Sequence, residues 1–221
     1  MDWQALILSI KLACVTLAVL LPAGVWLGRW LAYGTFAAKA WVEALVVLPL
    51  VLPPTVLGYY LLVSLGGASP IGRWVAQTFE LRLTFNFFGL VLASIVFNVP
   101  FLVQPVQRAF AAIPRQLAEA AAVSGLDAWQ TFWRVELPLA WPGVLSAMVL
   151  TFVHTLGEFG VVLMIGGSIP GETKTIAIAI YDRMQAFDLA SADRMAVLLL
   201  ILSLGAVGAS FFASARLTMR R

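Results

Sequence analysis

The sequence predicts an all-α protein, a polytopic membrane helical bundle of about five transmembrane helices that form a single domain over residues 1–221. Of these residues, 62% are hydrophobic and 11% are charged, and the mean hydropathy is +0.95. Such values lie far from those of soluble domains. Apolar stretches of about 20 residues can cross a lipid core of about 30 Å as helices. The predicted spans are about 5–28, 43–65, 85–107, 141–165 and 194–215.

The first apolar stretch is expected to remain in the protein as a span. It runs from Ala5 to Leu27 and contains one charge, Lys11, whose long side chain can reach the membrane surface. No basic region precedes it and no small-residue cleavage site is evident, so we interpret it as a retained helix and not as a signal peptide. The lone Cys14 excludes an internal disulfide.

The second span is expected to be kinked or locally unwound, because Pro49, Pro53 and Pro54 remove three backbone donors. The freed carbonyls need partners from neighbouring helices or from a water-filled cavity. We therefore expect the Pro53–Pro54 break, with Thr55 beside it, to face the protein interior or a pore. A structural kink without pore contact is the alternative. The following segment, 66–84, is interpreted as a loop.

Polar side chains in the third and fourth spans are candidates for packing or for a transport path. Asn98 either lines a path or joins helices by hydrogen bonds. Pro142 is expected at the first helical position, and this helix should end near Ile165. His154 and Glu158 are four residues apart and would share one helix face. Residues 175–189 are too short and too charged to span, and are interpreted as an interfacial helix at the outer side.

A polar stretch, Glu119–Pro138, separates the third and fourth spans but keeps a helical pattern. Its apolar residues recur at helical spacing on both sides of Gly125, which predicts a short helix, a glycine stop and a second helix that ends before Pro138. We expect Gly125 to adopt a positive φ and Glu119 to lie at the start of the first helix, near the positive end of its dipole. An amphipathic segment of this kind buries its apolar face against another protein or the membrane surface.

The residues of this stretch carry a resemblance to a known family. The spacing Glu-Ala-Ala, three residues, Gly, nine residues, an aliphatic residue, one residue, Leu-Pro resembles the EAA loop in the membrane-spanning subunits of bacterial ABC importers. Val135 departs from the isoleucine that this family prefers. The resemblance implies the transmembrane fold of a type I ABC importer, with residues 108–138 as a cytoplasmic coupling segment that docks on the ATPase. It also implies coupling roles for Glu119, Ala120, Ala121, Gly125, Leu137 and Pro138.

Two further stretches, Pro49–Leu62 and Leu156–Tyr181, resemble the permease subunits of molybdate importers. Permeases for sulfate and thiosulfate are similar and share a glutamate between glycines at the position of Glu158, so a sulfate, thiosulfate or other oxyanion permease is the alternative. Tungstate is not separable from molybdate by sequence, because the two dianions have nearly the same size and shape.

The resemblance also implies partners and a place in the cell. A homodimer in the bacterial cytoplasmic (inner) membrane would enclose the path, two ATP-binding ABC subunits would sit on its cytoplasmic side, and a periplasmic or extracellular molybdate-binding protein would deliver the anion. Lipid is the remaining partner, and no nucleic acid is expected. Candidates for the pore or gate are Pro53, Pro54, Thr55, Asn98 and Thr151. Candidates for the outer mouth are Glu158, Glu172 and Lys174, and we expect the last two to form an exposed pair of opposite charges.

Five spans with a cytoplasmic coupling segment place the N-terminus outside and the C-terminus in the cytoplasm. Eight Lys and Arg residues would then face the cytoplasm and five the outside, which has the sign that the positive-inside rule requires. The eight are Arg29, Lys39, Arg108, Arg115, Arg134, Arg216, Arg220 and Arg221, and the five are Arg73, Arg82, Lys174, Arg183 and Arg194.

The sequence offers no catalytic constellation. ATP hydrolysis needs a glycine-rich loop that ends in Gly-Lys-Ser/Thr, but Lys11, Lys39 and Lys174 follow Ile, Ala and Thr. A separate ATPase subunit would therefore supply hydrolysis. One histidine and one cysteine do not make a metal site, and no cofactor is expected. Other classes left open are a proton-coupled secondary transporter that uses His154 and Glu158, an intramembrane enzyme and a membrane scaffold.

Overall fold

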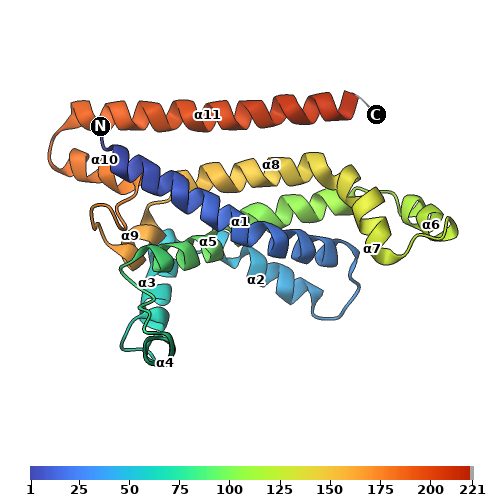
Figure 1. Ribbon diagram of the computed structural model, residues 1–221, viewed down its shortest axis with the longest axis horizontal. Coiled ribbons are helices and arrows are strands. Elements are labelled where there is room, and N and C mark those ends of the chain that lie inside the picture. Colours follow the sequence, from blue (N-terminus) through green and yellow to red (C-terminus); the bar gives the residue numbers. More distant parts are fainter. Residues whose placement is uncertain (220–221) are drawn as a thin grey trace.

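The computed structural model describes residues 1–219, without the side chains of Ala118 and of residues 213–219 (Figure 1). The described residues form helices and connections without strands, so the all-α prediction is confirmed. The elements are α1 (Trp3–Tyr33), α2 (Lys39–Val51), α3 (Pro54–Leu65), α4 (Pro70–Phe79), α5 (Phe87–Ala111), α6 (Arg115–Val123), α7 (Ala128–Thr131), the π-helix η1 (Phe132–Glu136), α8 (Leu137–Leu156), α9 (Gly160–Gly166), α10 (Ile176–Gln185) and α11 (Leu189–Met219).

The helix α5 lies at the centre of the bundle, and α1, α8, α2 and α9 all pack against it (Figure 1). Its buried side chains contribute to two apolar clusters. One, in its first half, joins Leu90 and Phe97 to Val161 of α9. The other, in its second half, joins Phe110 to Phe132 of η1. The core therefore continues from the broken helices at one end of the bundle to the coupling segment at the other.

Two glycines allow α1 to approach α5 closely. A Cβ atom at Gly24 would lie 2.4 Å from Leu102 Cδ2, and one at Gly28 would lie 2.7 Å from Val106 Cγ1. Gly24 and Gly28 are four residues apart and so occupy one face of α1. Small residues at this spacing let helix backbones pack tightly where lipid supplies no hydrophobic drive for association.

Five spans are present if one bent pair is counted as a single span. Within the described residues, α1, α5, Ala128–Leu156 and α11 are each long and apolar enough to cross a membrane. The fifth crossing consists of α2 and α3, which meet at 108°. The interruption lies at Leu52 and Pro53, so the predicted break in this span is confirmed.

The start of the fourth span differs from the prediction. Ala128–Leu156 is a continuous helix made of α7, η1 and α8, so the helix does not end before Pro138 and does not begin at Pro142. The N–H of Leu137 bonds to the Phe132 carbonyl, five residues back, which closes the wide turn of η1. Pro138 follows directly after this turn, and because it has no N–H it cannot donate to the hydrogen-bond ladder of the continuous helix.

The end of the fourth span also differs, because α8 stops at Leu156 and not near Ile165. The N–H of Gly157 bonds to the carbonyls of Val153 and His154, and the chain then turns through Glu158 and Phe159. The next residues form α9, which packs against α3. The turn contains one charged residue, Glu158, between two apolar helices, so hydropathy averaged over a window does not distinguish it from a continuing span.

The connections hold two further helices. The segment 66–84, interpreted as a loop, contains α4, which begins at Pro70. Ser69 caps this helix, because its side chain accepts the Gly72 N–H at 2.8 Å. The helix predicted within 175–189 is α10. It lies at the end of the bundle that holds the N-terminus (Figure 1), and its Ile176 N–H donates to Ser9 Oγ of α1 at 2.8 Å.

The last helix, α11, starts at Leu189, five residues before the predicted span 194–215. Asp188 accepts the Ser191 N–H at 3.2 Å and so satisfies a donor in the first turn. The hydrogen bonds from Ser191 lower the pKa of the Asp188 carboxyl. The side chain of Arg216, and Arg220 and Arg221 as a whole, lie outside the described residues.

Enlarging Gly28 is expected to weaken the bundle. Gly28→Leu drives a side chain into Val106 and the Gln107 backbone, and overpacking costs about 1–3 kcal/mol. We expect a melting temperature several degrees lower in detergent. The matched control is Gly205→Leu on α11, because a Cβ at Gly205 would meet nothing within 4 Å. Equal melting temperatures for the two variants would show that the α1–α5 contact is not tight.

Candidate functional site

The coupling segment contains a helix that stops at a left-handed glycine. α6 ends at Val123, and Gly125 has a φ of 79°, which confirms the positive φ predicted for it. The Gly125 N–H bonds to Ala122 O at 3.0 Å and the Leu126 N–H bonds to Ala121 O at 3.1 Å. This pair of hydrogen bonds is the Schellman termination of a helix. A Cβ at Gly125 would meet nothing within 4 Å, so backbone conformation, and not space, selects glycine here.

The next helix starts with a reciprocal cap. The Asp127 side chain accepts the Gln130 N–H at 2.7 Å, and the Gln130 side chain accepts the Asp127 N–H at 3.4 Å. This capping box fixes where the chain resumes its helix after the glycine turn. Sequence analysis missed it, although an Asp followed three residues later by Gln is its ordinary signal.

We expected Glu119 at the start of α6, but it lies further along this helix. The helix begins at Arg115, so Glu119 is its fifth residue, and the dipole effect falls off after the first turn. Glu119 and Ala120 are exposed, whereas Ala121 is buried. Of the Leu-Pro pair at the other end of the motif, Leu137 is half-buried and Pro138 is exposed. The motif residues therefore have different roles, some at the surface and some in the packing.

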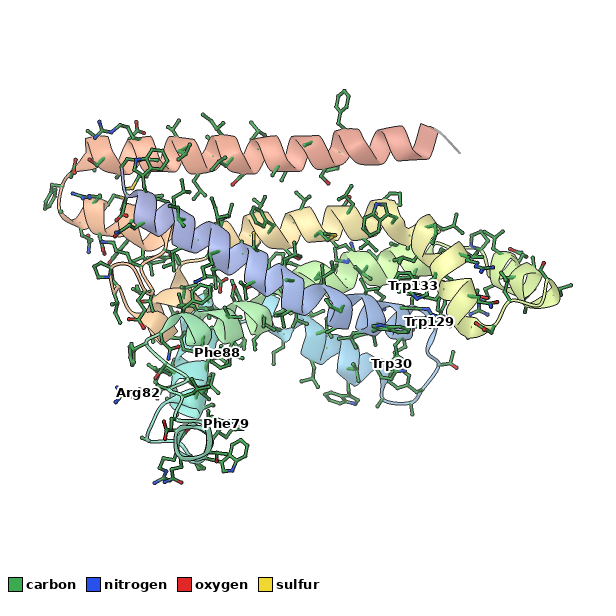
Figure 2. The ribbon with its side chains drawn as sticks, in the orientation of Figure 1. Trp30, Phe79, Arg82, Phe88, Trp129 and Trp133 are labelled. Atoms are coloured by element: carbon green, nitrogen blue, oxygen red, sulfur yellow. The ribbon has the colours of Figure 1, made fainter. Side chains whose placement is uncertain are left out.

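Large apolar side chains are exposed around this segment. Val123 is 90% exposed, Trp129 59% and Trp133 50%. Figure 2 shows the two tryptophans at the α7 end of the bundle. The exposed cations Arg115 and Arg134 lie on the same segment. An exposed apolar surface with charges beside it marks a site of interaction with another protein or a membrane surface.

Under this surface, an ion pair joins the coupling segment to α1. Arg29 Nη2 donates to Glu136 Oε1 at 3.1 Å, and Arg29 Nε donates to Glu136 Oε2. Glu136 is buried, on the π-helix η1. Arg29 follows the predicted first span, 5–28, but α1 continues through it to Tyr33. The pair was not predicted, because no local pattern relates two residues that are 107 positions apart.

At the other end of the bundle, the two helix breaks meet. A Cβ at Gly160, the first residue of α9, would lie 2.9 Å from Pro54 Cβ. A Cβ at Gly58 of α3 would lie 2.7 Å from Met164 Cβ. α3 and α9 thus form one tightly packed pair. Pro53, Pro54 and Thr55 are exposed, so the break faces away from the interior of this chain.

A buried polar cluster links this pair to α5. Ser94 Oγ donates to Glu158 Oε2 at 2.6 Å, and Asn98 Nδ2 lies 3.4 Å from the same oxygen. The Asn98 carbonyl oxygen is 3.0 Å from His154 Nδ1. Glu158 Oε1 has no hydrogen-bond partner among the described residues. His154 and Glu158 are therefore linked through Asn98 and not along one helix face, because α8 ends between them.

The remaining candidates are divided between the core and the surface. Asn98 and Thr151 are fully buried and Glu158 is 3% exposed, so none of the three lines an open surface in this conformation. The prediction that Glu172 and Lys174 pair with each other was wrong, because Lys174 Nζ contacts Asp182 Oδ2 at 2.7 Å. Among residues 1–219, no group of three or more His, Cys, Asp or Glu is arranged to hold a metal ion.

Glu172 instead lines an open cavity of about 880 Å³ between α4 and the segment that follows it. Glu80 and Arg82 also line this cavity. Figure 2 shows Arg82 and Phe79 at the α4 corner of the molecule. The sequence analysis did not anticipate this cavity because it did not predict α4.

A bundle with interrupted helices at one end and an exposed helix–glycine–helix segment at the other is the architecture of a transporter membrane subunit. Residues 21–221 match the family described as the binding-protein-dependent transport system inner membrane component, and the chain belongs to that family. It is 46% identical to the molybdenum transport system permease protein ModB of Azotobacter vinelandii, over 88% of this chain and 86% of that protein. The identity to ModB of Escherichia coli K12 is 38%, over 83% and 80% of the two chains.

Solved structures show the same fold. A bacterial ABC transporter that imports the acidic polysaccharide alginate has a chain that matches with a TM-score of 0.78 at 19% identity, over 96% of this chain and 78% of that one. The MetNI methionine ABC transporter, in an inward-facing form, matches with a TM-score of 0.68 at 21% identity, over 98% and 94%. The fold is that of ABC importer transmembrane domains, as predicted.

Removing the Glu158 carboxylate is expected to destabilise the protein. Glu158→Ala removes the acceptor of the buried Ser94 hydroxyl, while Asn98 Nδ2 still donates to the Ser94 carbonyl at 2.8 Å, and an unsatisfied buried group costs about 1–3 kcal/mol. Glu158→Gln keeps an acceptor oxygen and should stay closer to the wild-type melting temperature. Glu172→Ala, at an exposed glutamate, is the matched control and should change it little. If Glu158→Ala melts like the control, the cluster does not hold α9 to α5.

Proposed function

We propose that the chain is the membrane permease subunit of an ATP-driven importer that carries molybdate across the bacterial cytoplasmic membrane. Its similarity to molybdenum permeases over more than four-fifths of the chain carries this proposal. The exposed coupling segment, with its glycine termination and its apolar surface, supports it independently of sequence identity.

The proposed complex contains two copies of this chain, two ATPase subunits and a binding protein. The exposed break at Pro53–Thr55 would face the second copy across a two-fold axis, and the path would run between the copies. The surface around Trp129 and Trp133 would be covered by the ATPase. ATP hydrolysis would belong to that subunit. One of the related structures, the alginate transporter, was solved with an oligosaccharide-bound periplasmic protein.

The proposed orientation is supported by the positions of the termini at the two ends of the bundle. The N-terminus lies at the end opposite to α6 and α7, and the described end of α11 lies on the same side as α6 and α7 (Figure 1). With the coupling segment in the cytoplasm, the N-terminus is outside and the C-terminus inside. The cavity lined by Glu172 then opens at the outer side, where a binding protein would arrive.

The proposed mechanism is a rigid-body switch. ATP binding would draw the two ATPases together and carry both coupling segments with them, and the packed helices above would turn from inward-open to outward-open. A dianion needs hydroxyl and amide donors along its path, and carboxylates would repel it. Thr55 is exposed and available, whereas Asn98, Thr151 and Glu158 are covered in this conformation.

Sulfate is the second candidate substrate. The chain is 34% identical to the sulfate transport system permease protein CysT of Escherichia coli K12, over 76% of this chain and 61% of that protein. Liposomes that contain this chain with its ATPase, supplied with its binding protein, distinguish the two. Uptake of labelled molybdate that depends on ATP, is blocked by tungstate and persists in excess sulfate supports the proposal. Uptake without ATP that follows a proton gradient contradicts it.

A substitution at Gly125 is expected to uncouple transport. Gly125→Val places a β-branched residue at a φ of 79°, which displaces the α6–α7 turn without filling any packed space. In the same liposomes, we expect molybdate uptake per ATP hydrolysed to fall at least several-fold. Gly125→Asn is the control, since asparagine tolerates the left-handed conformation. Normal uptake by Gly125→Val would contradict the coupling role of this turn.

The orientation is tested by labelling single cysteines in a Cys14→Ser background. A cysteine at the exposed Ala128, on α7, should react with a membrane-impermeant reagent only from the cytoplasmic side. One at the exposed Ser168, after α9, should react only from outside. The reverse pattern would overturn the proposed topology.

A further inference from the structure

We propose that the pair Arg29–Glu136, with the aromatic rings around it, is the joint that transmits movement of the coupling segment to α1. Arg29 and Glu136 are positioning residues in this proposal, which rests on the proposed function. Neither residue belongs to the motif that defines the coupling surface, and Glu136 is 4% exposed, so it cannot contact an ATPase directly.

A joint is needed because α1 and the coupling segment are far apart in sequence. Arg29 and Glu136 are 107 residues apart, whereas α8 continues directly from α7 and η1. Movement of the coupling segment therefore reaches α8 through the covalent helix but reaches α1 through side-chain contacts. A hydrogen-bonded pair of charges is the most directional of these contacts.

The two hydrogen bonds of the pair resist movement of α1 relative to η1. The guanidinium meets both carboxylate oxygens through separate N–H groups, which fixes its plane relative to η1. The rings of Trp26, Tyr33 and Phe132 have their centroids 5.9, 5.5 and 5.5 Å from Arg29 Cζ. These distances are within the range of cation–π attraction, so the rings add further contacts to the guanidinium. Separation of the pair would leave a buried, uncompensated carboxylate, so the contact resists sliding.

Glu136 lies on the inward face of the π-helix η1. Phe132 and Glu136, at the two ends of η1, are both buried, while Trp133 and Arg134 between them are exposed. Single-turn π segments occur frequently at functional sites. The wide turn thus presents an exposed face to the proposed ATPase and, on its other side, an aromatic ring and a carboxylate to α1.

The helix α1 can carry the movement across the membrane. Its 31 residues extend about 46 Å at about 1.5 Å per residue. Near its other end, Ser9 accepts the Ile176 N–H of α10, and Ala5 and Leu6 pack against α10 and α11. The joint therefore connects the coupling segment to the helices at the outer end of the bundle.

The decisive variant is the double substitution Arg29→Gln/Glu136→Gln, compared with each single substitution. Each single variant leaves a buried partner unsatisfied and is expected to lower the melting temperature. The double variant removes both charges and should recover much of that loss. If the pair is a joint, the stable double variant still co-purifies with the ATPase but transports roughly tenfold less molybdate per ATP hydrolysed. Lys39→Met, which breaks an ion pair with a 4.0 Å separation in the neighbouring helix, is the control and should couple normally.

A distance measurement tests the joint without reference to the substrate. Spin labels at the exposed Ala23 of α1 and Ala128 of α7 should keep one distance with and without bound ATP in the assembled wild-type complex. In the double variant, ATP should shift or broaden that distance. A stable double variant with wild-type coupling, or a wild-type distance that changes with ATP, would overturn the joint. Failure of the wild-type complex to take up molybdate would contradict the proposed substrate, while the distances would still decide on the joint.

Discussion

The close contact between α1 and α5 is the constraint on which the arrangement of the other helices depends. Lipid is as apolar as the side chains that it surrounds, so helices in a membrane associate through close packing and buried hydrogen bonds. Gly24 and Gly28 supply the close packing, because each offers the α5 side chains a place that a Cβ would occupy. With α1 fixed on one side of α5, α2 and α8 pack on other faces of the same helix, and α10 is held against the first turns of α1.

The interrupted helices at the outer end obey a second constraint, the need of backbone groups for partners. A helix break inside lipid exposes carbonyls that nothing satisfies, so breaks occur where protein or water is in contact. Here one break contacts the other, with Gly160 against Pro54. On the protein side, Glu158 turns into the core and accepts a hydrogen bond from Ser94. On the other side the break is exposed, which is suitable for a water-filled path and unsuitable for lipid.

Composition and proline placement were enough to predict the helical class, five spans if α2 and α3 are counted as one, and the break before Pro54, because each depends on local properties of the chain. The positive φ of Gly125 was equally local. Three features were not predictable in this way. The end of α8 at Leu156 falls among residues of high hydropathy, so an average over a window does not register it. The position of Glu119 depends on where α6 begins, which no residue signals strongly. The Arg29–Glu136 contact joins residues that local pattern cannot relate.

These two constraints, together with the Arg29–Glu136 pair, limit how such a bundle can switch between two states. A packed core is nearly incompressible, so the helices that share the cluster of Phe110 and Phe132 must move as one body. On the proposed function, a displacement of the coupling segment reaches α8 through a continuous helix and α1 through the Arg29–Glu136 pair. If neither the continuous helix nor the ion pair bends or slides, the helices change their relative positions where they are already interrupted, at Leu52–Pro53 and at Gly157–Phe159. Those interruptions lie at the end of the bundle opposite to the coupling segment. The inner half of the bundle would therefore move as one body, and the outer half would change shape at its helix breaks.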